Sequence, residues 1–595
     1  MTRLLPRITA LLFVLLSPRA IHAESSTNEN ELVVARLTAF GRLYGYVRFF
    51  HPSDAAASAD WARVAVEGAR LVRLTPESSS LVEPLNGIFG PLTVGLRLGT
   101  EVVADNAASY QNARPARFTH WQYSGLSLEG QGQLQRRVIS DVISGPRAQM
   151  FESGVQWDQT VSGRLADGTW FLLPVALPVD SEDKTPSPSA SNLSGGEQVP
   201  VYDVRDPDVR IAGVVITWNV LQHFFPYWGD VREDWPSHLP IFIAKALSAD
   251  TPETYYDVLS ELIAITRDGH GYVYGRPDSY GGAPILVEKI EGRILVTAAA
   301  ADSPIRKRDV ILNIDGVDSH RVLEQRLRVT SGSDQLREFR ALNQYGRGPL
   351  GAEVSWSVLR DGREQGVRFR LGKDERGYFW NVLSAYSHPA IFEPKPGIFY
   401  VNLLSCPKSE FAKWLPELQS AKAIIFDWRH IGDYSPEDDQ INVLTDILPH
   451  LTSEALPAPP IYLSSIALPD GHHSQGRPVQ WKIEPAAPKI AGRAVFITIP
   501  GVVSYGETCM ALVVHHRLAQ TVGEATAGCN GGVSFIPLPG GPRVMWTQMK
   551  VTKHDGSRLY LDGYKPDYPV TRTIKSVLAG KDEYLEKALE VLGHN

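Results

Sequence analysis

Residues 494–507, with the sequence AVFITIPGVVSYGE, decide how the C-terminal part of this chain folds. The first six residues are apolar or β-branched, which is typical of a buried strand. Pro500 and Gly501 indicate a turn, and the residues up to about 517 are typical of a helix. Ser504 is therefore expected at the junction between this strand and the N-terminus of the helix.

Ser504 has two interpretations. A helix N-terminus presents unpaired N–H groups and a positive dipole, which stabilise an oxyanion beside an attacking hydroxyl. Ser504 and Glu507 also match a Ser-x-x-Glu capping box, in which both side chains only satisfy the first helical turn. Gly501 lies one residue too far away for the Gly-x-Ser-x-Gly turn of α/β-hydrolases, which excludes that class.

A nucleophilic serine needs a base, and the local sequence supplies only His515 and His516, well down the same predicted helix. Another candidate is His270, in the run Asp268-Gly269-His270 that follows helical spacing over residues 252–265. Residues 272–274 have strand character, so His270 is expected at a helix-to-strand junction. A histidine at this place is either a turn residue or, with a pKa near ~6.5, a general base at neutral pH.

The rest of the C-terminal part shows two kinds of pattern. Apolar runs alternate with helical patterns beyond residue 385, which predicts an α/β layer structure. The runs cover residues 398–404, 423–427, 494–499 and 518–522. Residues 284–371 contain short β-rich runs and one helix near 319–328, which predicts a small barrel-like β module.

The N-terminal third is set apart by a Ser- and Pro-rich segment at residues 181–197, which is typical of a solvated linker. Residues 32–71 have helical spacing, and residues 117–179 contain strand and hairpin patterns. A weak repeat relates residues 43–52 to residues 218–226, each followed by an Asp-Trp pair. We assign the aromatic residues of both copies to core packing.

Bulk properties narrow the class of protein. The 595 residues suggest about three to five folding units. A composition of 43% hydrophobic and 21% charged residues is that of a globular protein, and a net charge of −7 excludes electrostatic recruitment to nucleic acid or anionic membranes. Only Cys406, Cys509 and Cys529 are present, so at most one disulfide forms, with Cys509 to Cys529 as the candidate pair, and no metal-type cysteine spacing exists.

The N-terminus is typical of a secretory signal peptide. Arg3 and Arg7 precede the apolar run 8–16, and Ala23 provides a small residue for cleavage. The alternative, a membrane anchor, requires about 20 apolar residues, and no segment of the chain reaches that length. We therefore expect a secreted or periplasmic protein without an integral membrane span.

Six motifs in order then resemble the carboxy-terminal-processing (tail-specific) and tricorn-type serine peptidase family. The resemblance covers residues 211–592. The motifs are DGH at 268–270, DVILNIDG at 309–316, IFDWR at 425–429, SYGE at 504–507, VGEATAG at 522–528 and GYKPD at 563–567.

The resemblance implies a multidomain α/β protein. A crotonase-like α/β catalytic core is expected at residues 385–595, with a helical cap segment at 205–282 and an inserted PDZ-like β module at 283–375. An α+β N-terminal domain at residues 30–180 and a linker at 181–200 precede them, after a signal peptide at residues 1–23.

The same resemblance implies site residues. Ser504 matches the nucleophile and the N–H of Tyr505 one oxyanion donor, with Glu507 in the same motif. One branch of the family uses a lysine base, but that position reads Gly528-Cys529-Asn530 here, so His270 matches the base of the tricorn-like branch.

Two departures from the family pattern concern the remaining roles. The stretch after Arg429 continues His430-Ile431-Gly432-Asp433, which makes Gly432 the candidate second oxyanion donor. Tyr560 stands where the tricorn-like branch has a relay glutamate. Asp562 is the nearest carboxylate and the candidate third relay member, with Asp268 as the alternative.

The sequence therefore predicts a serine endopeptidase that cleaves polypeptides, needs no cofactor or metal, and uses its PDZ-like module to hold a polypeptide end. The alternative is a catalytically silent peptide- or ligand-binding protein on the same scaffold, because sites rather than folds carry function.

Overall fold

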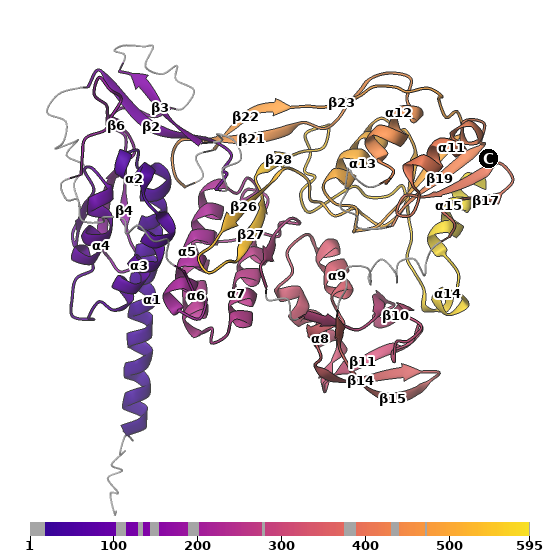
Figure 1. Ribbon diagram of the computed structural model, residues 1–595, viewed down its shortest axis with the longest axis horizontal. Coiled ribbons are helices and arrows are strands. Elements are labelled where there is room, and N and C mark those ends of the chain that lie inside the picture. Colours follow the sequence, from indigo (N-terminus) through magenta and orange to yellow (C-terminus); the bar gives the residue numbers. More distant parts are fainter. Residues whose placement is uncertain are drawn as a thin grey trace, which may run out of the picture.

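A computed structural model describes nine stretches of the chain (Figure 1). They are residues 18–102, 115–128, 135–142, 154–188, 201–276, 280–373, 388–429, 439–470 and 473–593. Most of the predicted signal peptide and residues 189–200 of the predicted linker lie outside them. Among the described residues, no helix combines the length and the apolar character that crossing a bilayer requires.

The C-terminal part is built on a six-stranded sheet that confirms the predicted α/β layer. Neighbouring strands from β18 to β29 pair in parallel, and only β17 is antiparallel. The order is β17(Ile391–Lys395), β18(Ile398–Asn402), β19(Ala423–Trp428), β24(Arg493–Thr498), β25(Gln520–Gly523) and β29(Tyr568–Pro569). Four of these strands coincide with the apolar runs that the sequence shows.

Helices cover both faces of this sheet. Ile424 and Phe426 of β19 face a core that includes α11(Lys408–Gln419), α12(Leu448–Leu451) and α13(Tyr505–His515). Ile425, between them, faces a second core formed with α15(Glu583–Gly593). Such burial on both faces is the reason that strands of a parallel sheet are continuously apolar.

A separate β module lies between the helical segment and this sheet, as predicted. Its main sheet has the order β15(Arg363–Arg370), β14(Glu353–Arg360), β11(Val310–Ile314), β10(Arg293–Ala299) and β9(Ile285–Ile290), with β12(Val317–Asp318) beside β11. Helices α8(Ser319–Arg328) and α9(Asp334–Asn343) complete it, and β8(Tyr280–Gly282), β13(Arg347–Pro349) and β16(Gly372–Lys373) form a small sheet at its base. β9 is an edge strand of the main sheet, with α9 beside it.

The helices on both sides of the predicted linker share one hydrophobic core (Figure 1). The long helices are α1(Pro18–Phe50), α3(Trp61–Arg73), α5(Pro207–Phe224), α6(Trp235–Ser248) and α7(Pro252–Ile265), and the short ones are α2(Asp54–Ser58), α4(Val82–Phe89) and η1(Gly90–Leu92). The assignment of the repeated aromatic residues to packing is confirmed. Trp218 and Trp235 are buried, and each indole N–H donates to the backbone carbonyl of the other residue.

A mixed set of strands also joins the N-terminal third to the C-terminal core. β2(Arg117–Ser124) pairs with β3(Gln135–Asp141), β6(Leu177–Pro178) and β21(Ile461–Ile466), and β21 pairs with β22(His473–Val479) and β28(Met549–Val551). Figure 1 shows β21 and β22 reaching from the core toward β2 and β3. The two sides of the predicted linker thus share both a core and a sheet.

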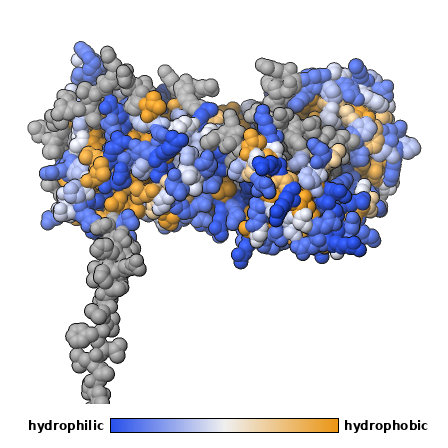
Figure 2. All heavy atoms as spheres, turned by 60° about the horizontal axis from the view of Figure 1, so that its bottom comes forward, coloured by the Kyte–Doolittle hydropathy of each residue, from blue (hydrophilic) through white to orange (hydrophobic). Residues whose placement is uncertain are grey.

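Smaller sheets complete the structure. They comprise β1(Arg97–Gly99), β5(Trp170–Pro174) and β4(Thr160–Arg164); β26(Val533–Pro537), β27(Arg543–Thr547) and β7(Tyr272–Tyr274); and β20(Leu456–Pro457) with β23(Lys482–Ile483). Within the described stretches, the remaining helices are η4(Val443–Ile447) and α14(Ile574–Ala579). The face in Figure 2 is mainly hydrophilic with separate apolar patches, as expected for a globular protein of mixed charge.

The close approach of α1 and α5 is the basis of a first prediction. A Cβ atom at Gly45 would lie 1.8 Å from the side-chain oxygen of Asn219, whose amide donates to the carbonyls of Gly41 and Val215. Gly45→Ala is therefore expected to lower the free energy of unfolding by about 1–3 kcal/mol through overpacking.

Gly87→Ala in α4 is the matched control, because a Cβ atom there meets no other atom within 4 Å. It should leave stability unchanged or raise it by up to about 1 kcal/mol through helix propensity. Thermal unfolding of both variants decides the matter, and equal midpoints would contradict the close contact.

Candidate active site

Ser504 occupies a strained position between β24 and α13. Its backbone angles are φ 55° and ψ −113°, in a region that side chains other than glycine rarely adopt. Its N–H donates to the carbonyl of Cys529 at 2.8 Å. In this strained conformation Ser504 lies at the N-terminus of α13, where the helix dipole favours negative charge.

The capping-box interpretation of Ser504 is wrong. The N–H groups of Glu507 and Thr508 donate to the backbone carbonyl of Ser504, and the Ser504 side chain makes no capping hydrogen bond. The hydroxyl is thus not committed to the first turn of the helix.

Glu507 is fully buried and holds a loop instead of the helix end. Its carboxylate accepts hydrogen bonds from the Thr526 hydroxyl, from the N–H of Gly528 at 2.8 Å and from the N–H of Cys529. Burial raises the pKa of Glu507 to about 7, although the three donors act in the opposite direction. Glu507 therefore fixes residues 526–529, including the carbonyl that Ser504 contacts, and has the position of a supporting residue.

His270 is buried at the start of β7 and is oriented by a threonine. Its Nδ1 lies 2.8 Å from the Thr547 hydroxyl, which lies 2.6 Å from Asp268 Oδ1. A carboxylate only accepts, so the single hydroxyl proton of Thr547 is donated to Asp268, and the Thr547 oxygen accepts from Nδ1–H. This network assigns the proton of the neutral ring to Nδ1 and leaves Nε2 with a free lone pair, the form that a general base requires.

The buried carboxylate of Asp268 is well compensated. Besides the Thr547 hydroxyl it accepts the Thr547 N–H at 2.6 Å and the His270 N–H at 2.9 Å. Burial lowers the pKa of His270, and Asp268 opposes this effect while Arg340 adds to it. The imidazole is thus neutral at neutral pH, as a proton acceptor must be.

Thr547 is a candidate site residue that the sequence alone does not reveal. It lies at the end of β27, which pairs with β7 so that Met545 faces Tyr272. Continuing that antiparallel register by two residues brings Thr547 opposite His270. No local motif marks this threonine, because the contact depends on pairing between strands more than 250 residues apart.

Ser504 and His270 both contact Cys529, each through a different atom of that residue. The Cys529 carbonyl accepts from the N–H of Ser504, and its sulfur lies 3.3 Å from His270 Nδ1. Among the described residues, neither the Ser504 hydroxyl nor His270 Nε2 has a hydrogen-bond partner, so the two groups do not bond to each other directly. Catalytic hydrogen bonds are commonly long in structures without substrate.

The cysteine prediction needs a correction. Cys406, Cys509 and Cys529 are all buried free thiols, so the disulfide between Cys509 and Cys529 does not form. Cys529, at the position of the family's lysine base, packs beside the histidine instead.

Three further residues were predicted to belong to the site, namely Tyr505, Asp562 and Gly432. Tyr505 begins α13, and its hydroxyl contacts the side chain of Asn442. The carboxylate of Asp562 pairs with Arg558 at 2.7 Å and is 40% exposed, so it does not orient His270. Gly432 lies outside the described residues.

Tyr560, at the position where a relay glutamate was expected, anchors the segment that carries His270. Its ring stacks on that of Tyr227 with centroids 3.9 Å apart, and its hydroxyl donates to the carbonyl of Thr266 at 2.7 Å. Thr266 precedes Asp268 by two residues. The tyrosine thus anchors the segment that carries Asp268 and His270, while Asp268 supplies the carboxylate.

The β module contacts the site directly through α9 and the residue before it. Ser333 donates to the carbonyl of Ala527 at 2.6 Å, Gln335 to that of Thr526 at 3.1 Å, and Arg340 to that of Gly269 at 2.5 Å. The module therefore touches both the loop that Glu507 holds and the turn that carries His270.

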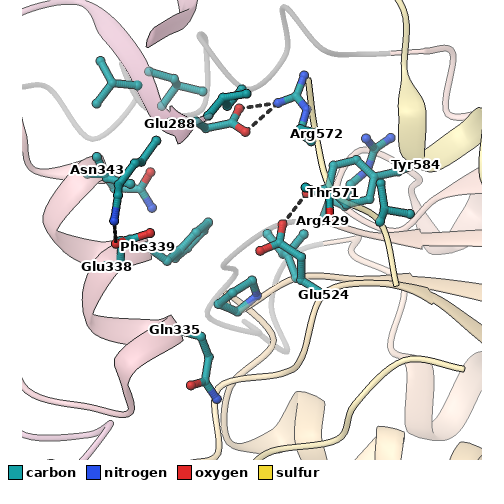
Figure 3. A pocket seen from close by; sticks show the side chains of 18 of the residues that line it. Glu288, Gln335, Glu338, Phe339, Asn343, Arg429, Glu524, Thr571, Arg572 and Tyr584 are labelled. Carbon is teal, nitrogen blue, oxygen red and sulfur yellow. Dashed lines mark hydrogen bonds and ion pairs between the residues drawn. The ribbon is translucent and has the colours of Figure 1, made fainter. Parts of the chain in front are cut away.

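A cavity of about 440 Å³ lies between the β module and the parallel sheet (Figure 3). One wall comprises β9 and α9, including Glu288 and Phe339, and Figure 3 shows Glu288 paired with Arg572 across the cavity. The other wall follows the carboxyl ends of the parallel strands, where ligands of α/β proteins commonly bind. Its residues there are Asn402, Asp427, Ile499, Pro500, Glu524 and Val570.

The Asp427-Trp428-Arg429 motif has a structural role beside this cavity. Arg429 donates to both Asp427 and Asp582, which ties the end of β19 to the start of α15. Burial lowers the pKa of Arg429, but the two carboxylates outweigh it and hold the guanidinium charged.

Asp268, His270 and Cys529 offer potential metal-ligand atoms within 4.8 Å of one another. Thr547 already engages Asp268 and His270 through its hydroxyl, so these two side chains have partners without an ion.

The strain at Ser504 leads to a second prediction. Ser504→Gly and Ser504→Ala both remove the hydroxyl, but only glycine adopts a positive φ without steric cost. We expect Ser504→Gly to unfold at the higher temperature, with an advantage of about 1 kcal/mol over Ser504→Ala after the entropy of the extra glycine is deducted. Equal midpoints in thermal unfolding would contradict the strained geometry.

Comparisons with known proteins bear on the fold. No protein-family model and no curated protein matches the sequence. Solved structures that are similar include mature CPAF complexed with lactacystin (TM-score 0.54, 16% identity, covering 65% of this chain and 98% of that one) and mature CPAF (TM-score 0.52, 14% identity, 65% and 96%). The photosystem II D1 C-terminal processing protease aligns at a TM-score of 0.36 with 14% identity, over 64% of this chain and 97% of that one.

Mature CPAF aligns with this chain at TM-scores of 0.54 and 0.52 and is the structure that shows its fold. At this identity it shows a shared fold over about two-thirds of the chain, and it shows no more than the fold. About two-thirds of the chain thus has the fold of mature CPAF. The structure adds a histidine, a threonine and an aspartate joined by hydrogen bonds and a serine in a strained backbone conformation.

Proposed function

We propose that this chain is a serine endopeptidase that hydrolyses polypeptides through an acyl-enzyme on Ser504, with His270 as general base. The observation that carries the proposal is the buried Asp268–Thr547–His270 network beside Ser504. It sets the tautomer of the histidine, and a buried network of this kind has no evident role in a simple turn.

These groups account for every proton transfer of the proposed hydrolysis. His270 Nε2 takes the proton of the Ser504 hydroxyl as its oxygen attacks the peptide carbonyl, and the resulting imidazolium gives the proton to the leaving amine. A water molecule then attacks the acyl-enzyme, with Nε2 again accepting a proton and returning it to Ser504. Thr547 and Asp268 hold the ring and stabilise its charged form, as the third member of a catalytic triad does.

The N-terminus of α13 provides the electrostatic contribution. The oxyanion forms next to Ser504, where the helix dipole and the N–H of Tyr505 favour negative charge. Removal of one such donor typically costs about 10²–10³ in kcat, so this contribution is comparable to that of the base.

The cavity in Figure 3 supports a polypeptide as substrate. β9 is an edge strand with α9 alongside, an arrangement that accepts an extended peptide as an additional strand. Pro500 lines the same cavity four residues before Ser504. We propose that the PDZ-like module holds a polypeptide end in this cavity and that the chain extends from there toward Ser504.

We also propose that the protein acts outside the cytoplasm, on the basis of the N-terminal segment. Cleavage after Ala23 predicts Glu24 as the first residue of the exported protein. N-terminal sequencing of that protein tests this, and an intact Met1 would overturn it.

The alternative function is polypeptide binding without catalysis. The absence of a direct hydrogen bond between Ser504 and His270 among the described residues favours it, and the cavity serves either function. The two differ in whether the Ser504 hydroxyl is chemically activated.

A fluorophosphonate probe separates the two functions, because it reacts with activated serines and leaves inert ones unlabelled. We expect stoichiometric labelling of the exported chain, its loss in Ser504→Ala, and a decrease of at least ~10²-fold in rate in His270→Ala. Absence of labelling in a folded wild-type protein favours the binding function. Labelling that persists in Ser504→Ala refutes the nucleophile.

Substitution of Thr547 tests the relay. Thr547→Val keeps the shape but removes the hydroxyl between Asp268 and His270, so the ring loses the contact that sets its tautomer. We expect the maximal rate of probe labelling to fall about 10²-fold while the probe concentration at half-maximal rate stays unchanged.

Thr547→Ser is the matched control, because it keeps the hydroxyl and should retain most of the rate. A Thr547→Val variant that reacts as fast as the wild type would show that the threonine only packs against His270.

A further inference from the structure

Three histidines from distant segments converge at the far end of α13 from Ser504. His515 is the last residue of the helix, His516 follows it, and His554 lies in the turn after β28. The rings of His515 and His554 stack in parallel with centroids 4.0 Å apart, and His516 lies edge-on to both. An ion lies in the plane of each imidazole that binds it, so the exposed His515 ring has to turn out of the stack to share an ion with His554. A potential ligand nitrogen from each ring lies within 4.8 Å of the other two.

One backbone carbonyl sets the tautomers of two of these rings. The carbonyl of Pro457 lies 3.2 Å from His516 Nε2 and 2.9 Å from His554 Nε2. A carbonyl only accepts, so both Nε2 atoms carry a proton and the lone pair of each neutral ring is on Nδ1. Histidines that bind metal typically donate their other N–H to a carbonyl or carboxylate in this way.

The surroundings suit a cation. The carbonyl end of α13 carries the negative end of the helix dipole, which attracts positive charge. His515 is exposed and the other two rings are half-buried, so an ion reaches the cluster from solvent. The neighbouring Lys553 does not compete for the position, because its ammonium group lies over the ring of Tyr564.

We propose that His515, His516 and His554 bind one Zn²⁺ or a similar transition-metal ion such as Cu²⁺ or Ni²⁺. Imidazole nitrogen is a preferred ligand of these ions, whereas Ca²⁺ and Mg²⁺ require oxygen ligands. Three histidines leave a fourth tetrahedral position for water. The bound ion fastens the C-terminal end of α13 to the turn at residue 554, which steadies the helix that begins at Ser504.

This site can be tested separately from the proposed peptidase activity. It shares no side chain with the Asp268–Thr547–His270 network, and its test is a binding measurement. Failure of one proposal therefore leaves the other standing.

Calorimetric titration of the metal-free chain, without an affinity tag, with Zn²⁺ provides the test. We expect one ion per chain, with affinity lowered at least about tenfold in His554→Gln and in His515→Gln. His320→Gln is the matched control, because His320 is an exposed histidine on α8 of the β module and should have no effect. Circular dichroism of the metal-free variants verifies that they are folded.

Titration with Co²⁺ distinguishes the proposed site from the buried Asp268–His270–Cys529 group. Three imidazoles produce d–d bands alone, whereas ligation by Cys529 adds a sulfur-to-cobalt charge-transfer band that Cys529→Ser abolishes. Such a band, absence of Zn²⁺ binding, or equal affinity of His554→Gln and the wild type each overturns the proposal.

Discussion

The buried carboxylate of Glu507 is the constraint on which the centre of this protein depends. It is taken out of water completely, a state that is costly for a carboxylate without hydrogen-bond donors, and the loop at residues 526–529 supplies three donors. Because this loop donates hydrogen bonds to Glu507, the position of Cys529 is fixed. The carbonyl of Cys529 accepts the N–H of Ser504, and its sulfur lies 3.3 Å from His270 Nδ1. One carboxylate thus determines the relative positions of residues from three parts of the chain.

The candidate site is assembled from opposite sides of this loop. The parallel sheet and α13 present Ser504, whereas the pairing of β7 with β27 presents His270 and Thr547. The β module then contacts both sides through Ser333 and Arg340. Its edge strand borders the cavity at the carboxyl ends of the parallel strands. The module thus contacts the segments that carry both sets of candidate residues.

Helix α13 links the two proposals. Its N-terminus concentrates positive potential at Ser504, and its C-terminus concentrates negative potential at the histidine cluster. The same alignment of peptide dipoles favours an oxyanion at one end and a metal ion at the other. An ion at the C-terminal end would act on the position of the helix and leave the chemistry to the residues around Cys529.

The sequence by itself determined the α/β layer, the β module and the places of Ser504 and His270, because strands buried on both faces and amphipathic helices leave local patterns. Several elements, such as α7 and α8, match the predicted residues closely. Tertiary structure alone decided which groups meet. Thr547 joins Asp268 to His270, Asp562 turns to Arg558 at the surface, and Glu507 holds a loop where a cap was plausible. The physical reason is that strand register and the burial of charge act between residues far apart in the chain, so a local pattern identifies a candidate side chain but not its partner.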